Sequence, residues 1–346
     1  MKTMQHQYIE RDSGAVRTER LFGDRLVGLL YHSVRENAPL LFRALTSARS
    51  SAFLGLVNYD LPLGGKGRRW RFLQECGVDP AECLDAPETL DTPRKVFERK
   101  IRYRDYRPMP DDPDAVVSPA DARVLVGSFR EISALFIKEK FFSYAEFFGH
   151  DKGKWLERFR DGDFAVFRLT PDKYHYNHTP VSGTVLDIYE IAGHYHSCNP
   201  GAVVAAVTPF SKNKRVVTVI DTDVPGGTGV GLVAMVEVVA LMIGEIVQCY
   251  SEEGYLSPQP VKAGTFFRKG VPKSLYRPGS STDVLIFRRG RVEFAADIVR
   301  NMSHPAATSR FSSGFGRPLV ETDVRVRSLI ARGVKTQQPQ TSGAEP

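Results

Sequence analysis

Hydrophobic and polar positions follow two different patterns along the chain. Between residues 21 and 57, apolar residues recur at three- and four-residue spacing, which predicts amphipathic helices. Two further helices are predicted at residues 68–77 and 93–101, the second with Thr92 as its N-cap before Pro93. The first third of the chain is therefore expected to be helical.

From Val116 onward, short runs of β-branched and aromatic residues are separated by Gly, Pro, Asn and Asp, as in strands joined by turns. Strands are predicted at residues 123–126, 134–137, 164–169, 183–188, 203–207, 215–220, 232–239, 243–250 and 284–287. Frequent short strands are typical of a sandwich or barrel. We predict an α+β fold, in which N-terminal amphipathic helices precede a mainly β core of sandwich or barrel type.

Three regions follow from these patterns. Residues 1–110 are expected to form an N-terminal helical region that associates with a membrane, and residues 111–333 a β-rich domain. The tail at 334–346 is rich in Gln, Pro, Ser and Gly, so we expect it to be disordered.

Charge adds a second property to the N-terminal region. Six arginines are interspersed between residues 17 and 49. A basic amphipathic segment can lie in the headgroup layer of an anionic membrane, but two helices packed on the domain explain the pattern equally well. The net charge of +7 is compatible with nucleic acid, an anionic membrane or an acidic substrate, and it does not choose among them.

Cellular location is constrained by what the sequence does not display. No apolar run reaches the length needed to cross a bilayer, because Glu237 and Glu245 interrupt the longest one. The first twenty residues contain no apolar signal-peptide core. Four scattered cysteines favour a reducing compartment. We expect a cytoplasmic protein that lies peripherally on the membrane surface.

Candidate chemistry is concentrated in a few segments. An Asp at 121, a His pair at 175 and 178, and a Ser at 280 together suggest an acid, a base and a nucleophile. Gly279, directly before Ser280, leaves its carbonyl open to attack. Each piece alone is weak, since Gly-Ser is common in turns. The His pair could also be structural, or bind a metal with His194 and His196, although further ligands with suitable spacing are not apparent.

Taken together and in order, these segments resemble the phosphatidylserine decarboxylase family over residues 91–294. The similarity lies in Ser-Pro-Ala-Asp at 118–121, in the double-His segment at 169–183, and in Lys-Gly at 269–270 followed by Gly-Ser-Ser at 279–281. The segment 136–149 is similar to a further family stretch. Ala122 and Pro278 depart from the family pattern, and the final strand lies one residue further from the serines. That shift leaves Ser280 and Ser281 both open as the reacting residue, and Gly279 favours Ser280.

The resemblance implies a self-cleaving proenzyme. Asp121 would orient His178, and His178 would take the proton from the Ser280 hydroxyl, which attacks the Gly279 carbonyl. The chain would split into two fragments that stay together, and Ser280 would become a pyruvoyl group, the cofactor, with no metal. His175 or His178 would then return a proton to the substrate.

The implied reaction converts phosphatidylserine to phosphatidylethanolamine and CO2 on an anionic membrane, without a nucleic-acid partner; a homo-oligomer is left open. A relative that decarboxylates a soluble amino acid is one alternative, and a non-catalytic lipid-binding protein is another. The basic N-terminal segment favours the lipid over the soluble substrate. The complete Asp, His and Gly-Ser set argues against the non-catalytic protein.

Overall fold

The computed structural model describes residues 5–21, 59–130, 144–205, 209–240, 245–279 and 281–334. The predicted helices between 22 and 58, the predicted strand at 134–137 and the tail beyond 334 lie outside these residues. Ser280 also lies outside them, although its neighbours on both sides are described.

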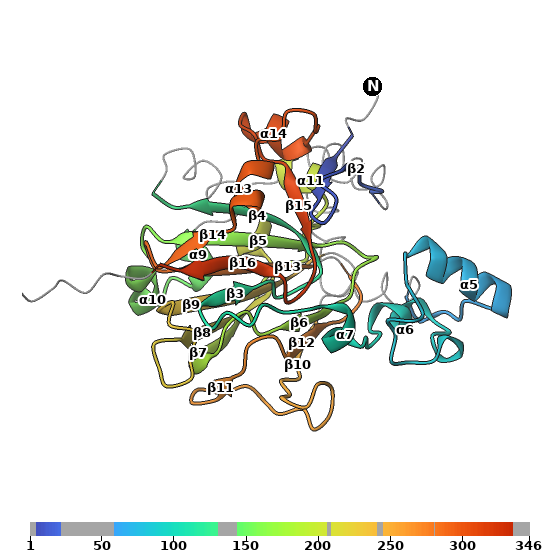
Figure 1. Ribbon diagram of the computed structural model, residues 1–346, viewed down its shortest axis with the longest axis horizontal. Coiled ribbons are helices and arrows are strands. Elements are labelled where there is room, and N and C mark those ends of the chain that lie inside the picture. Colours follow the sequence, from blue (N-terminus) through green and yellow to red (C-terminus); the bar gives the residue numbers. More distant parts are fainter. Residues whose placement is uncertain are drawn as a thin grey trace, which may run out of the picture.

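One large antiparallel sheet forms the centre of the protein (Figure 1). Its strand order is β11 (Phe266–Phe267), β7 (Gly183–Ile191), β8 (Arg215–Asp221), β9 (Leu232–Val239), β13 (Ser281–Phe287), β5 (Asp163–Leu169), β4 (Ala122–Ser128), β15 (Glu321–Val324), β1 (Gln7–Glu10) and β2 (Val16–Thr18). Of these neighbours, only β1 and β15 pair in parallel. The first residues of the chain thus join the same sheet as residues near its end.

Two three-stranded sheets accompany the large one. The first has the order β10 (Ile246–Gln248), β12 (Pro272–Tyr276) and β6 (Tyr176–His178). The second has the order β14 (Val292–Phe294), β16 (Leu329–Gly333) and β3 (Ala115–Val117). β12 is followed in sequence by β13, so the chain passes from a small sheet to the middle of the large one between residues 276 and 281.

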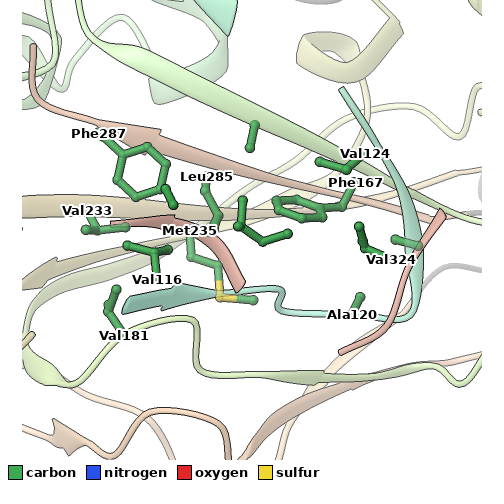
Figure 2. Packing of buried hydrophobic residues seen from close by; sticks show 14 of the residues in the cluster. Val116, Ala120, Val124, Phe167, Val181, Val233, Met235, Leu285, Phe287 and Val324 are labelled. Carbon is green, nitrogen blue, oxygen red and sulfur yellow. The ribbon is translucent and has the colours of Figure 1, made fainter. Parts of the chain in front are cut away.

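The large sheet is covered on both faces. Successive side chains of a strand point to opposite faces, and in β13 Val284 and Ile286 pack in one core cluster while Leu285 and Phe287 pack in another. The first cluster includes residues of α9 (Tyr144–Phe148), α10 (Gly153–Arg158), α11 (Pro200–Ala205) and α14 (Arg310–Phe315). The second includes Val116 of β3, and Figure 2 shows these side chains packed together. Burial on both faces explains why β13 ends in an uninterrupted apolar run.

Within the N-terminal region, residues 7–18 form β1 and β2 of the large sheet instead of helices, and residues 59–110 form a small helical unit. It contains α5 (Lys66–Glu75), a 3-10 helix at Pro87–Thr89, α6 (Pro93–Phe97) and α7 (Tyr103–Tyr106). Thr92 caps α6 as predicted, because its hydroxyl accepts a hydrogen bond from the Lys95 N–H at 3.2 Å. The helix is shorter than predicted and ends at Phe97. Two further short helices, α12 (Pro209–Lys212) and α13 (Ala296–Asn301), lie in the later, β-rich part of the chain.

The α+β prediction is confirmed, and most predicted strands form within a few residues of their expected bounds. The strand predicted at 203–207 is wrong over its described residues, which belong to α11. The Asn199 side chain accepts a hydrogen bond from the Gly201 N–H at 2.8 Å. An Asn followed by Pro is a helix-start signal, and here it outweighs the strand preference of the valines. Of the strand predicted at 243–250, the described residues form a strand only at Ile246–Gln248.

A buried ion-pair cluster attaches the N-terminal strands to the large sheet. Arg168 of β5 donates hydrogen bonds to Glu19 at 2.5 Å and to Glu321 of β15 at 2.6 Å. His6 lies 2.7 Å from the same Glu321 carboxylate. All four side chains are at most 5% exposed. Arg168 therefore holds two carboxylates that would repel each other without it.

Replacing Arg168 with Met should lower the free energy of unfolding by about 3 kcal/mol or more, because two buried carboxylates lose their cation. Urea unfolding followed by circular dichroism measures this. The matched control is Arg17→Met, which removes an exposed pair with Glu10 and should change stability by less than about 1 kcal/mol. Equal effects of the two substitutions would show that the buried cluster contributes nothing special.

Candidate active site

His178 is the most tightly held of the candidate residues. It is fully buried, its Nδ1 lies 3.0 Å from the Gly270 carbonyl oxygen, and its Nε2 lies 2.9 Å from the Tyr174 hydroxyl. Because a carbonyl only accepts, Nδ1 carries the proton, and in the neutral ring Nε2 is the basic nitrogen. Burial lowers the pKa of His178 to about 3. The ring is therefore neutral and presents one acceptor nitrogen to a hydroxyl.

Asp121 is held by other partners. Arg107 donates two hydrogen bonds to its carboxylate, from Nε at 3.0 Å and from Nη2 at 2.8 Å, and the Val326 N–H donates a third at 2.8 Å. Burial alone would raise the pKa of Asp121, but Arg107 more than offsets this and holds the pKa below its ordinary value. Asp121 is thus an ionised carboxylate deep in the protein.

The expected hydrogen bond between Asp121 and His178 is not formed. Both ring nitrogens of His178 have other partners, and the Gly270 carbonyl, rather than Asp121, fixes the tautomer. Gly270 has φ +78°, and a Cβ there would clash with the Met109 sulfur. Only glycine brings that carbonyl to His178 at this point. Asp121 acts on His178 through its charge, which raises the pKa of the ring against the larger effect of burial.

His175 lies in an apolar setting. Its ring stacks on Phe97 with 3.5 Å between ring centroids and 10° between planes. Among the described residues, neither ring nitrogen has a hydrogen-bond partner. Burial, assisted by the charge of Arg99, lowers the pKa of His175 to about 3. A buried imidazole with unused nitrogens is costly, and such groups are often retained for chemistry.

The segment proposed to be cut is the connection between two sheets. The Tyr276 N–H, at the end of β12, donates to the His175 carbonyl at 3.1 Å. The Tyr276 hydroxyl reaches across the connection to Asp283 Oδ1 at 2.7 Å and to the Thr282 carbonyl at 3.1 Å. Gly279 has φ +149°, a conformation that other residues rarely adopt. The connection is therefore fixed at both ends, and His175 is adjacent to its start.

A buried polar network lies beside this connection. Lys273 of β12 donates to Glu237 of β9 at 2.7 Å, both side chains being fully buried, and to Gln248 of β10 at 2.8 Å. Asn177 of β6 donates to the same Glu237 carboxylate at 3.3 Å. The network therefore joins all three strands of the small sheet to the large sheet.

Asp283 faces this network from β13. It pairs in register with Glu237 on the neighbouring strand. Burial, together with the nearby Glu237 charge, raises the pKa of Asp283 well above its ordinary value. Asp283 is thus a neutral carboxylic acid two residues after Ser281, whose own buried hydroxyl has no partner among the described residues. The strand period places both side chains on the same face.

Known proteins with a similar sequence share one description. A family model of phosphatidylserine decarboxylase matches residues 94–311, which is more than half of the chain. The chain belongs to the phosphatidylserine decarboxylase family. A phosphatidylserine decarboxylase proenzyme of Fusobacterium nucleatum is 29% identical over 306 residues, 87% of this chain and 94% of that protein. One of Chlamydia trachomatis serovar L2 is 30% identical over 298 residues, 84% and 90% respectively.

A fungal relative is matched in the same part of the chain. Phosphatidylserine decarboxylase proenzyme 3 of Schizosaccharomyces pombe is 27% identical over 297 residues, which is 84% of this chain but only 28% of that longer protein. The family assignment predicted from the sequence motifs is confirmed, and with it the assignment to a decarboxylase family.

The structure brings some predicted site residues of this decarboxylase together and separates others. Asp121, His175 and His178 are all buried, and Gly279 lies in the connection that starts beside His175. His194 is exposed and bridges to Asn213, and the two rings of His194 and His196 lie 5.7 Å apart. They belong to a different loop.

Sequence reasoning missed several members of the site. Arg107, Lys273 and Asp283 carry no motif of their own that indicates a partner. The available signal was a charge inside an apolar strand, Glu237 in β9 and Asp283 in β13, since a charge in a strand buried on both faces requires compensation.

Acid should destabilise this decarboxylase through its two buried histidines. Their folded-state pKa of about 3 lies below the ordinary 6.5, so below pH 6.5 the unfolded chain binds protons that the folded chain does not. Between pH 7 and pH 5, each histidine should cost roughly 2 kcal/mol of unfolding free energy. His175→Phe should remove its share of this loss, as measured by urea unfolding at both pH values.

The matched control is His150→Gln, because solvent surrounds the exposed His150 side chain in both states. Its pH dependence should equal that of the unchanged protein. If His175→Phe also showed an unchanged pH dependence, the His175 ring would be protonated in the folded protein at pH 5.

Proposed function

We propose that this protein decarboxylates phosphatidylserine to phosphatidylethanolamine and CO2, using a pyruvoyl group that it makes by cutting itself between Gly279 and Ser280. The observation that carries the proposal is the setting of this bond. Gly279 belongs to the connection between two sheets, which the Tyr276–Asp283 hydrogen bond spans. Its φ is one that residues other than glycine rarely adopt. The chain belongs to this decarboxylase family.

The cleavage step is balanced by groups of the chain and by water. The Ser280 hydroxyl loses its proton to a base and attacks the Gly279 carbonyl carbon, and the C–N bond breaks to leave an ester. Loss of the Ser280 α-proton then expels the Gly279 carboxylate and ends the upstream fragment. Water replaces the remaining nitrogen, which leaves as ammonia. His178 is the proposed base, supported by its neutral ring, in which Nε2, 2.9 Å from the Tyr174 hydroxyl, is the basic nitrogen.

The residues around the connection suit a pyruvoyl group at position 280. When present, such a group supplies an electron sink that lets a carboxylate leave as CO2. Asp283 offers a neutral acid near that position, and one of its oxygens has no partner among the described residues. His175, adjacent to the start of the connection and also without ring partners among those residues, is proposed to hold the proton that replaces CO2 on the substrate.

The two fragments should remain one folded body. β13, at the start of the downstream fragment, is paired on one side with β9 and on the other with β5. β15 and β16 of the same fragment pair with β1, β4 and β3. These strand pairs support a proenzyme that stays assembled after the cut.

Because the proposed substrate is a lipid, we propose that the protein binds peripherally to the cytoplasmic face of a membrane. Among the described residues, no helix has the length and apolar character that crossing a bilayer requires. The arginine-rich segment, residues 17–57, lies outside the described residues from residue 22 onward, and its role in binding anionic lipid is proposed from its sequence alone.

Cleavage should yield a fragment that begins at residue 280 with a blocked, pyruvoyl N-terminus, as read by mass spectrometry. Ser280→Ala should leave one uncut chain, and the matched Ser281→Ala should be cut. The reverse result would make Ser281 the reacting residue, an alternative supported by its buried hydroxyl without a partner among the described residues. An intact chain that is nevertheless active would contradict self-cleavage itself.

Substitutions of the acid–base residues distinguish those that act in self-cleavage from those that act in decarboxylation. His178→Ala and Asp121→Asn should slow cleavage, His178→Ala by about a hundredfold or more. His175→Ala should allow cleavage but impair decarboxylation. Normal cutting by His178→Ala together with a block in His175→Ala would exchange the two roles.

The substrate can be separated from its soluble alternative by measuring CO2 release from phosphatidylserine vesicles and from free serine in parallel. We expect release only from the lipid. Vesicle flotation of a variant with Arg25, Arg35, Arg43 and Arg49 changed to Gln should be weaker than that of the unchanged protein, since each basic residue contributes about 1 kcal/mol near an anionic surface.

Substitution is preferable to deletion here, because β1 and β2 belong to the large sheet. The matched control changes four exposed arginines elsewhere to Gln, namely Arg68, Arg71, Arg288 and Arg289. Equal flotation of both variants would leave the arginine-rich segment without a role in membrane binding. Activity on free serine alone would instead favour the soluble-substrate decarboxylase.

A further inference from the structure

A polar pocket of about 230 Å³ lies between the N-terminal helical unit and the large sheet. Its wall includes Asp121 and Tyr174, whose hydroxyl bonds the basic nitrogen of His178. It also includes four cationic side chains, Arg99, Arg107, Lys173 and Arg325. The pocket therefore adjoins the candidate site, and nothing in the acid–base chemistry above uses Arg99.

Arg99 differs from the other three cations in its partners. Arg99 is only 7% exposed. Its guanidinium donates hydrogen bonds to the backbone carbonyls of Val96 at 2.9 Å and Asp172 at 3.2 Å. Among the described residues, no carboxylate lies within 4 Å of its guanidinium. A guanidinium has five N–H donors, so two carbonyls leave donors unused and the charge unmatched. A buried, unmatched charge is costly unless a ligand compensates it.

The other three pocket cations have carboxylate partners, and the exposed Arg325 lies 3.6 Å from Asp12. Arg107 is paired with Asp121 and with Glu82, at 2.8 and 2.9 Å. Lys173 is paired with Asp323 at 2.7 Å. These two pairings also take up three of the carboxylates that line the pocket.

Two carboxylates of the pocket remain. Asp79 is exposed and accepts a hydrogen bond from the Ala81 N–H. Asp172 is half-buried and offers Arg99 its backbone carbonyl. Neither forms an ion pair with Arg99, so among the described residues Arg99 is the buried cation of the pocket that has no carboxylate partner.

We propose that Arg99 binds the phosphodiester of the phospholipid headgroup, and that this pocket is the headgroup subsite. The inference rests on the proposed function and specifies how its substrate is held. An arginine guanidinium matches the geometry of phosphate oxygens and can donate two parallel hydrogen bonds to them.

The chemistry of decarboxylation favours the phosphodiester over the substrate carboxylate as the Arg99 ligand. The carboxylate loses its charge as CO2 forms, so a cation holding it would stabilise the substrate more than the transition state and slow the reaction. The phosphodiester keeps its charge throughout. A cation holding it stabilises substrate and transition state alike, which lowers KM and leaves kcat unchanged.

The position of Arg99 in the chain fits this assignment. Phe97, two residues earlier, stacks on His175, the residue proposed to hold the proton for the substrate. One short segment thus provides both the surface that positions an acid–base ring and the cation for the headgroup. A phosphodiester at Arg99 would be anchored beside the place where the substrate is protonated.

The test compares holoenzyme carrying Arg99→Gln with the unchanged holoenzyme, on short-chain phosphatidylserine. KM should rise roughly 10- to 100-fold, the worth of one hydrogen bond to a charged group, with kcat nearly unchanged. Arg99→Lys should give a smaller rise because the charge is kept. Arg102→Gln is the matched control: it removes an exposed arginine three residues away and should leave KM unchanged. A fall in kcat with unchanged KM would overturn the proposal.

A binding measurement separates this inference from the proposed function. By calorimetry, the unchanged holoenzyme should bind glycerophosphoethanolamine, which has the phosphodiester but no carboxylate, more tightly than free serine, and Arg99→Gln should lose that binding. If the protein lacked decarboxylase activity yet showed this loss, the subsite would stand and the proposed function would fail.

Self-cleavage and the thermal midpoint report whether Arg99→Gln is folded. If Arg99→Gln is not folded, binding to the unchanged holoenzyme still tests the proposal. Absence of glycerophosphoethanolamine binding to that protein would overturn the assignment of the pocket as the headgroup subsite. Loss of serine binding alone in Arg99→Gln would assign the guanidinium to a carboxylate and overturn the phosphodiester assignment.

Discussion

The site depends on the placement of β13 in the middle of the large sheet while β12, directly before it, belongs to a small sheet. The four residues between Tyr276 and Ser281 must cross from one layer to the other, and the Tyr276 hydroxyl, 2.7 Å from Asp283, closes this connection. Such a crossing leaves little freedom to its backbone, and the φ of +149° at Gly279 is one consequence. The candidate bond is therefore held in place by strand pairing rather than by the connection itself.

The same layering determines the charge states around the connection. Side chains between the sheets are removed from water, so groups without an oppositely charged ion-pair partner become neutral: His175, His178 and Asp283 all have pKa values shifted toward the uncharged form. Groups that remain charged are matched, as Glu237 is by Lys273 and Asp121 by Arg107. A site with neutral bases and a neutral acid can move protons near neutral pH without first creating a buried charge.

Sequence alone predicted the parts of this arrangement that are local. β9 and most of β8 coincide with their apolar runs, and Thr92 caps its helix, because spacing and capping act within a few residues. The family motifs also identified Asp121, His175 and His178, and each of these side chains is buried. The partners could not be predicted, since Gly270 is 92 residues from His178 and Lys273 is 36 residues from Glu237. Which nitrogen, carbonyl or carboxylate meets which is determined by sheet order, and no spacing in the chain encodes that order.

These features together explain how a chain of this family can lose a peptide bond in its interior and remain folded. The ends produced by a cut after Gly279 would belong to different sheets, one through β12 and the other through β13 between β9 and β5. Both elements retain their hydrogen bonds and their apolar neighbours after the cut, so cleavage removes a connection without removing packing. The uncut fold must form first, because only strand pairing brings His175 beside Tyr276 and fixes the glycine conformation. Under the proposed self-cleavage, folding would therefore be the step that creates the reactive geometry, and the covalent change would follow from it.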